Sequence, residues 1–88
     1  MYYVYILKSI DKNFTYIGAT NDLKRRYELH NSGKVTSTKY FCPLKLLYYE
    51  AFIDKNDAFA REQYLKTGWG RSFIKKVLKN SLSKNFGR

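Results

Sequence analysis

Two runs of β-branched and aromatic residues near the start of the chain limit what it can fold into. They cover residues 2–7 and 14–19, and a short polar segment separates them. Two such runs with a short connection predict a β-hairpin. Because side chains alternate between the faces of a strand, Tyr5 and Tyr16 can share one face, where aromatic pairing alone would explain them. Gly18 interrupts the second run and marks either a bulge or a close approach by a ligand or backbone.

The rest of the chain predicts one more strand and three helices. A helix over residues 23–31 is followed by a loop over 34–43 and a strand over 44–53. Two further helices are predicted over residues 54–66 and about 71–79, from their caps and apolar spacing. The predicted order is β-β-α-β-α-α. This order favours an α+β domain, with helices flanking a small three-stranded antiparallel sheet.

The length of 88 residues leaves room for one domain. We expect it to cover residues 1–79, with residues 80–88 as a basic, flexible tail that has few apolar anchors. No apolar run approaches the roughly 20 residues of a membrane span, and the first residues do not resemble a signal peptide. The single cysteine, Cys42, cannot form an internal disulfide. These features predict a cytoplasmic protein.

The charge of the chain is strongly positive. Seventeen Lys and Arg residues face seven Asp and Glu residues, which gives a formal net charge of +10. Such an excess attracts polyanions, and nucleic acid is their usual form. Solubility, an anionic membrane surface or an acidic protein partner would also account for it, so charge alone does not identify the partner.

Two charged residues fall on stripes that the helices should turn inward. The stripe of the helix over 54–66 consists of Ala58, Phe59, Glu62 and Leu65, and that of the helix over 23–31 of Leu23, Arg26, Tyr27 and His30. A carboxylate turned inward must be paired, bind a metal or have a raised pKa. Arg61 or Arg26 could therefore be a simple ion-pair partner of Glu62, and His30 could be an ordinary buried or surface histidine.

Taken together, these residues supply what hydrolysis of a phosphodiester bond needs. A carboxylate can hold a hard cation such as Mg²⁺ together with water and phosphate. An arginine can meet the charge that develops on phosphate oxygens. A phenol or an imidazole can take the proton of an attacking water. The sequence therefore offers the set of groups that a nuclease needs.

The same residues resemble a known family, the GIY-YIG endonucleases. Tyr3-Val4-Tyr5 and Tyr16-Ile17-Gly18 resemble its paired signature. Residues 19–26 with His30 are similar to its first helix, and residues 59–71 resemble its metal-binding helix and the turn that follows. The resemblance covers residues 2 to about 79. Within the family, the chain is most similar to small stand-alone members related to the N-terminal nuclease domain of the excinuclease.

The resemblance implies a role for each residue of a metal-dependent DNA endonuclease. Tyr5 and Tyr16 would border the scissile phosphate, and Arg26 would stabilise its developing charge. His30 would assist proton transfer or hold a tyrosine. Glu62 would be the sole protein ligand of one Mg²⁺ or Mn²⁺. The general base stays open among Tyr5, Tyr16 and His30.

The expected partner is DNA, which could be plain, branched or damaged, as in DNA repair. RNA as a substrate and a protein partner that supplies targeting are both left open. The basic residues that we expect to contact it are Lys24, Arg25, Lys39, Arg71, Lys75 and Lys76. Ala19 stands where some family members carry a lysine, and an asparagine that some carry after the glutamate has no counterpart here. The alternative function is therefore a nuclease-like module that binds DNA or RNA and cuts poorly.

Overall fold

The computed structural model describes residues 1–83 and has the predicted α+β architecture. Its elements are β1 (Tyr2–Ser9), β2 (Thr15–Thr20), α1 (Leu23–Asn31), the short 3-10 helix η1 (Lys39–Phe41), β3 (Leu44–Phe52), α2 (Lys55–Leu65), α3 (Gly68–Val77) and α4 (Lys79–Ser83). The three-stranded antiparallel sheet and the order β-β-α-β-α-α are confirmed. No helix in this part of the chain is long and apolar enough to cross a membrane.

The sheet has the strand order β2-β1-β3, so the first strand of the chain is its centre. Both pairings are antiparallel, and the β1–β3 pair has a register shift between Ile6 and Leu7. Residues 4–7 of β1 are all buried, because helices cover both faces of this strand. β2 forms one edge of the sheet, and this edge holds the candidate site.

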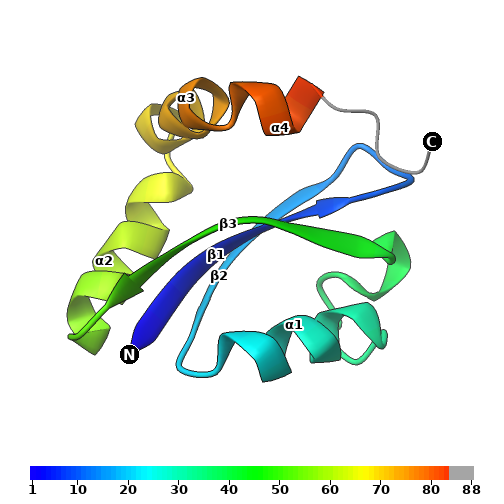
Figure 1. Cartoon of the computed structure of the whole chain (residues 1–88), viewed down its shortest axis with the longest axis horizontal. Helices are drawn as coiled ribbons and strands as arrows, with labels where there is room; N and C mark the ends of the chain where they lie inside the picture. Colours follow the sequence, from blue (N-terminus) through cyan, green and yellow to red (C-terminus); the bar gives the residue numbers. More distant parts are fainter. Residues whose placement is uncertain (84–88) are drawn as a thin grey trace.

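Helix α1 lies on one side of the sheet and α2, α3 and α4 lie on the other (Figure 1), and each side has its own core. Val4 and Ile6 pack against α2 and the C-terminal helices through Ala58, Leu65 and Ile74. On the other face the buried residues are Tyr5, Leu7 and Leu44, and partly buried side chains of α1 and η1 pack against them. The alternation predicted for the first strand is therefore the division between the cores.

Helix caps explain where the observed boundaries differ from the predicted ones. The Thr67 side chain accepts a hydrogen bond from Gly70 N, so α3 begins at Gly68, three residues before the predicted start. The predicted loop over 34–43 contains η1. The predicted tail starts within α4, whose Leu82 packs against the core, and residues 84–88 lie outside the described residues.

Candidate active site

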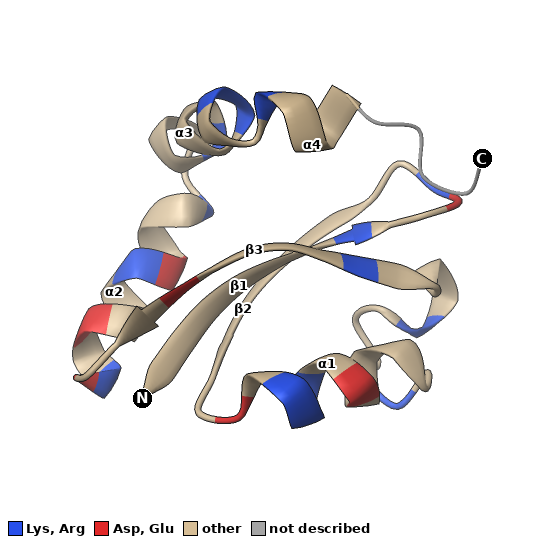
Figure 2. Ribbon diagram, viewed as in Figure 1, with Lys and Arg blue, Asp and Glu red and all other residues tan. Residues whose placement is uncertain are grey.

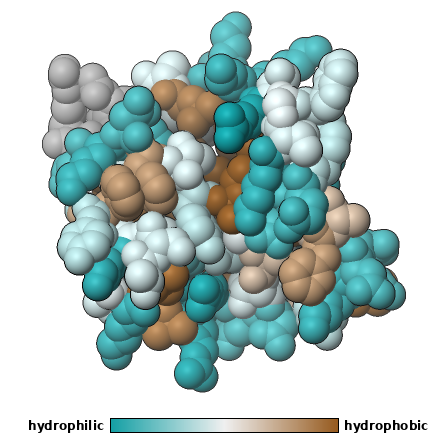
Figure 3. All heavy atoms as spheres, turned by 180° about the vertical axis from the view of Figure 1, so that it is seen from behind, coloured by the Kyte–Doolittle hydropathy of each residue, from teal (hydrophilic) through white to brown (hydrophobic). Residues whose placement is uncertain are grey.

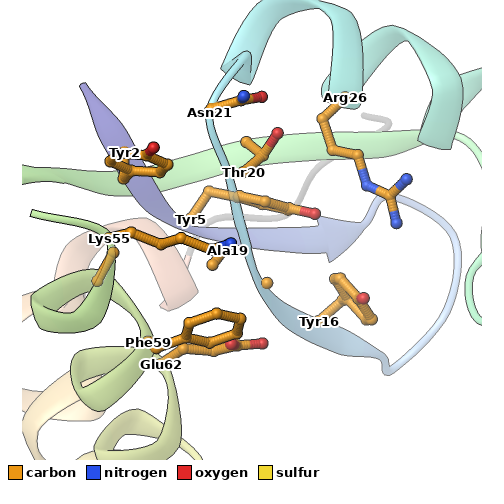
Figure 4. Close-up of a pocket in the computed structure, with 12 residues that line it drawn as sticks. Tyr2, Tyr5, Tyr16, Ala19, Thr20, Asn21, Arg26, Lys55, Phe59 and Glu62 are labelled. Atoms are coloured by element: carbon orange, nitrogen blue, oxygen red, sulfur yellow. The ribbon is translucent and has the colours of Figure 1, made fainter.

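A cavity of about 370 Å³ lies at the β2 edge of the sheet and is bordered by residues of both α1 and α2. It is lined by Tyr2, Tyr5, Tyr16, Gly18, Ala19, Thr20, Asn21, Arg26, Lys55, Ala58, Phe59 and Glu62. Figure 4 shows Arg26 extending from α1 and Glu62 from α2 toward the space beside the two tyrosine rings. The structure thus brings together four of the five residues predicted for catalysis and metal binding.

Gly18 gives the Tyr5 side chain the space to reach this cavity. The two residues are paired directly across β1 and β2, in a register without a bulge. A Cβ atom at position 18 would lie 2.5 Å from the Tyr5 hydroxyl oxygen and 2.9 Å from a ring carbon of Tyr16. Gly18 therefore marks neither a bulge nor an approach by a ligand or backbone, and it leaves room instead for the Tyr5 side chain.

The two tyrosines form an aromatic cluster with His30. The Tyr5 and Tyr16 ring centroids are 6.2 Å apart, as the shared face of the hairpin predicts. The His30 ring lies 5.6 Å from the Tyr5 ring and 5.0 Å from the Tyr16 ring. His30 does not line the cavity; it is fully buried behind the tyrosines.

A chain of hydrogen bonds runs from Tyr5 into the protein. The Tyr5 hydroxyl is 2.8 Å from His30 Nε2, and His30 Nδ1 is 2.8 Å from Thr38 Oγ1. A phenol is a stronger acid than the N–H of a neutral imidazole, which favours the tautomer in which His30 Nδ1 donates to Thr38 Oγ1; Thr38 Oγ1 also lies 3.5 Å from the Val35 carbonyl oxygen. His30 Nε2 is then the acceptor, and the Tyr5 hydroxyl donates to it. All three linked side chains are buried.

Burial and the charge of Arg26 set the protonation states of this chain. Burial raises the pKa of Tyr5, although the neighbouring Arg26 guanidinium acts in the opposite direction. Burial, aided by the positive charge of Arg26, lowers the pKa of His30 to about 4. At neutral pH the structure therefore holds a protonated phenol hydrogen-bonded to a neutral imidazole.

Arg26 reaches the cavity because of how α1 begins. Asp22 caps the helix by accepting a hydrogen bond from Arg25 N, and this places Arg26 on the side of the tyrosines. Contact with Tyr5 raises the pKa of Arg26 further. The ion pairs within residues 1–83 are Arg61–Glu50 and Lys66–Glu62. Arg26 belongs to neither pair, so its guanidinium is available to an anion in the cavity.

Glu62 has neither of the two partners that its sequence context suggested. Arg61 pairs with Glu50, and the Glu62 Oε2 atom is 2.9 Å from Lys66 Nζ, one turn along α2. The Glu62 side chain is 13% exposed, and its other oxygen is free of this pair. Phe59, expected on the inward stripe, is instead 49% exposed and lines the cavity.

The donor set fits one hard divalent cation. Within the described part of the chain no cluster of three or more His, Cys, Asp or Glu residues could hold a metal ion. Mg²⁺ nevertheless needs only one or two protein carboxylates when phosphate and water complete its shell. Glu62 supplies one carboxylate, and Arg26 at the same cavity can bind the phosphate that would supply further oxygens.

Sequence reasoning missed Thr38 and Lys55. Thr38 lies in a loop without periodicity, so no spacing signal relates it to His30 eight residues earlier. Lys55 opens α2 and adds a second cation to the cavity, with its Nζ atom 5.8 Å from the Phe59 ring centroid. A positive charge beside an exposed aromatic on the next helical turn was the only available signal.

The basic residues predicted to contact nucleic acid come from several elements and line different hollows. Arg71 and Lys75 line a second cavity, Lys24 lines a groove with Tyr3 on the other face, and Lys39 lies over the Tyr40 ring. Arg25 borders a shallow depression beside Arg26. Lys76 is exposed on α3. Figure 2 shows that α3 and α4 carry basic and no acidic residues, whereas α1 and α2 carry both.

Comparisons with known proteins agree with this geometry. The family model of the GIY-YIG catalytic domain matches residues 1–76. A UPF0213 protein of Streptococcus pyogenes serotype M3 is 44% identical over 71 residues, which cover 80% of this chain and 76% of the relative. A UPF0213 protein of Limosilactobacillus reuteri is 44% identical over 68 residues, covering 74% and 70%. No solved structure matches significantly.

Proposed function

The chain belongs to the GIY-YIG family, and from that premise we propose that it is a metal-dependent endonuclease that hydrolyses a DNA phosphodiester bond at a single-metal site. Membership of the family gives it a nuclease-like function. The observation that carries the finer proposal is the convergence of four side chains, from four different elements, on one cavity of about 370 Å³. These side chains are Tyr5, Tyr16, Arg26 and Glu62.

Arg26 binds the scissile phosphate in this proposal. Its guanidinium borders the cavity and is not occupied by a carboxylate in the described residues. Its planar set of N–H donors can hold two phosphate oxygens and meet the charge that grows there during the reaction. Lys55, on the opposite side of the same cavity, can neutralise a neighbouring phosphate.

Tyr5 orients the attacking water and passes on its proton. The Tyr5 hydroxyl donates to His30 Nε2, so the lone pairs of its oxygen can accept a hydrogen bond from water in the cavity. Because its pKa is raised, Tyr5 can accept the proton of water at Oη only while its own proton moves to His30 Nε2. The bond from His30 to Thr38 keeps Nε2 in the accepting form.

Glu62 would hold the cation, Mg²⁺ or Mn²⁺. When bound, such an ion polarises the phosphate and stabilises the leaving oxygen. Before a substrate arrives, Lys66 holds one oxygen of Glu62 and keeps the carboxylate directed along α2.

A nuclease-like module that binds nucleic acid and cuts poorly is the second candidate. Ala19 contributes only a methyl group to the cavity, at the position where some relatives have a lysine. The charged groups that influence Tyr5 are accordingly Arg26 and Glu62, and the pKa of the phenol is raised rather than lowered. This observation favours slow chemistry at a well-formed binding site.

A cleavage assay with supercoiled plasmid and branched DNA tests the proposal. We expect nicking with Mg²⁺ or Mn²⁺, none with a chelator, and none with Glu62→Ala or Arg26→Ala. Residual activity in both variants equal to that of the unmodified protein would identify a contaminant and refute the proposal. Binding that survives chelation and gives no product with any cation would favour the second candidate.

A further inference from the structure

A second cavity, of about 550 Å³, lies between β2 and the two C-terminal helices. It is lined by Phe14, Thr15, Tyr16, Ile17, Ser37, Lys66, Arg71, Ile74, Lys75 and Leu82. Tyr16 lines this cavity and the candidate active site, so the two are neighbours across a single ring. Its volume is in the range of about 300–1,000 Å³ that small-molecule sites in proteins have.

The inner part of this cavity is apolar and aromatic. Ile17, Ile74 and Leu82 belong to or pack against the core between the sheet and the C-terminal helices. Phe14 is held in place by stacking on Phe41, with ring centroids 3.8 Å apart. On the face of the molecule seen from behind, apolar side chains lie in a hollow near the middle and hydrophilic ones surround it (Figure 3). A phosphate group alone would gain no favourable contact from such an apolar lining.

The rim of the cavity is positively charged. Lys66, Arg71 and Lys75 line it, and no acidic residue does. Residues 68–83 as a whole contain no acidic residue (Figure 2). Lys66 also connects the two sites, because it forms the ion pair with Glu62. An occupant must therefore combine a flat apolar face with negative charges close to it.

We infer that this cavity is a subsite for an unpaired nucleobase of the DNA strand that is cut. In a duplex both faces of a base are covered by its neighbours, so only an unstacked base can place a face against an aromatic and aliphatic wall. Its flanking phosphates then meet the three cations of the rim. The subsite rests on the proposed function, because it specifies which DNA the same active site would cut. That DNA has a single-stranded segment beside the cleaved bond.

Binding of matched DNA substrates tests the subsite apart from cleavage. We would measure dissociation constants by fluorescence anisotropy in a chelator, for a blunt duplex, the same duplex with a short single-stranded overhang, and that duplex with abasic overhang residues. We expect the overhang to tighten binding at least about fivefold, the lower end of what one stacked base contributes, and the abasic overhang to lose that gain. Equal binding of base-containing and abasic overhangs would overturn the subsite.

Variants with matched charge locate the effect. Arg71→Gln/Lys75→Gln removes two cations of the rim, whereas Lys45→Gln/Lys79→Gln removes two exposed cations that do not line the cavity. Thr15→Trp fills the cavity from an exposed strand position that tolerates an aromatic residue. We expect the first variant and Thr15→Trp to abolish the preference for the overhang and the control pair to keep it, with folding checked by circular dichroism. Loss of the preference in the control pair alone would contradict the assignment.

The two proposals can fail separately. A protein that nicks DNA through Glu62 and binds all three substrates alike keeps its function and loses the subsite. A protein that prefers the base-containing overhang and never cuts keeps the subsite and loses the endonuclease assignment.

Discussion

Two clusters in this small protein contain the same kinds of side chain and differ in how far they are closed. At the β2 edge, Tyr5, Arg26 and Glu62 border a cavity. On the far side of α2, Tyr48 donates to Glu50 Oε2 at 2.6 Å, and Arg61 Nε and one terminal nitrogen bind the same carboxylate at 2.7 and 2.9 Å.

The second cluster leaves little for a ligand to bind. Both oxygens of Glu50 are occupied, and the Arg61 guanidinium also lies 4.6 Å from the Phe73 ring centroid and 5.3 Å from that of Tyr64. The pKa of Glu50 is lowered by the Arg61 hydrogen bonds, as expected for a structural ion pair. A tyrosine, an arginine and a glutamate thus indicate catalysis only where their polar atoms stay open to a cavity.

Replacing the two glutamates should separate the clusters most clearly. Glu62→Gln removes the charge that would hold the cation, so we expect nicking to fall about a thousandfold or more, by analogy with loss of a dominant electrostatic contribution. Its folding stability should change by less than about 0.5 kcal/mol, because the pair with Lys66 is an i,i+4 surface pair.

Glu50→Gln is the matched control. We expect a loss of about 1–3 kcal/mol in the free energy of unfolding, from the charged hydrogen bonds of Arg61 and Tyr48, with turnover per folded molecule unchanged. Urea denaturation and plasmid nicking measure the two quantities. If Glu50→Gln lowered turnover as much as Glu62→Gln, the distinction between an open and a closed cluster would fail.

The two arginines provide the next comparison. Arg26→Lys keeps a positive charge at the cavity and loses the planar fork, so we expect the nicking rate to fall about a hundredfold. Arg61→Lys should leave the rate per folded molecule unchanged and lower stability by about 1 kcal/mol, since it loses a bidentate contact and stacking on Phe73. Similar rates for Arg26→Lys and the unmodified protein would show that only charge matters at that position.

The sequence predicted the open cluster better than its surroundings. Strand alternation, helical spacing and the family resemblance together predicted that Tyr5, Tyr16, Arg26 and Glu62 share one site, because each lies on a regular element whose period fixes its direction. Neither the partner of Glu62 nor that of Arg61 followed from that reasoning. Arg61 and Glu62 are adjacent in the sequence, and their side chains point about a hundred degrees apart around α2. Only the packed sheet shows which of them meets Glu50 on β3.

Positions without a period were beyond such reasoning. Thr38 is fixed by its bond to His30 across a loop, and the helical start at Gly68 by the Thr67 cap. The reason for Gly18 likewise depends on a direct pairing with Tyr5 that the sequence alone does not specify. The contacts of Thr38 and Gly18 join residues whose separation follows no regular repeat.

A change at Thr38 should have a smaller effect on the cleavage rate, which depends on the buried hydrogen bonds that link Tyr5, His30 and Thr38. Thr38→Val keeps the size of the side chain and removes the acceptor for His30 Nδ1, so Nε2 is no longer held in the accepting form. We expect kcat to fall about tenfold with an unchanged KM, a modest loss for an indirect proton-transfer partner. Thr38→Ser should restore the rate, because it keeps the hydroxyl. A Thr38→Ser variant as slow as Thr38→Val would assign the effect to packing.

The pH dependence of the free energy of unfolding should also distinguish the two clusters. The unfolded chain protonates His30 near pH 6.5 and the folded protein only near pH 4, so between these values the unfolded state binds more protons and stability falls as the pH falls. The slope should reach at most about 1.4 kcal/mol per pH unit. Glu50, whose folded pKa is lowered from 4.5, loses its contribution only below that value. His30→Gln should therefore abolish the pH dependence between 6.5 and 4.5, and Glu50→Gln should keep it. Urea midpoints measured across this range test both, and an unchanged slope in His30→Gln would show that another group in the folded protein carries the acid sensitivity.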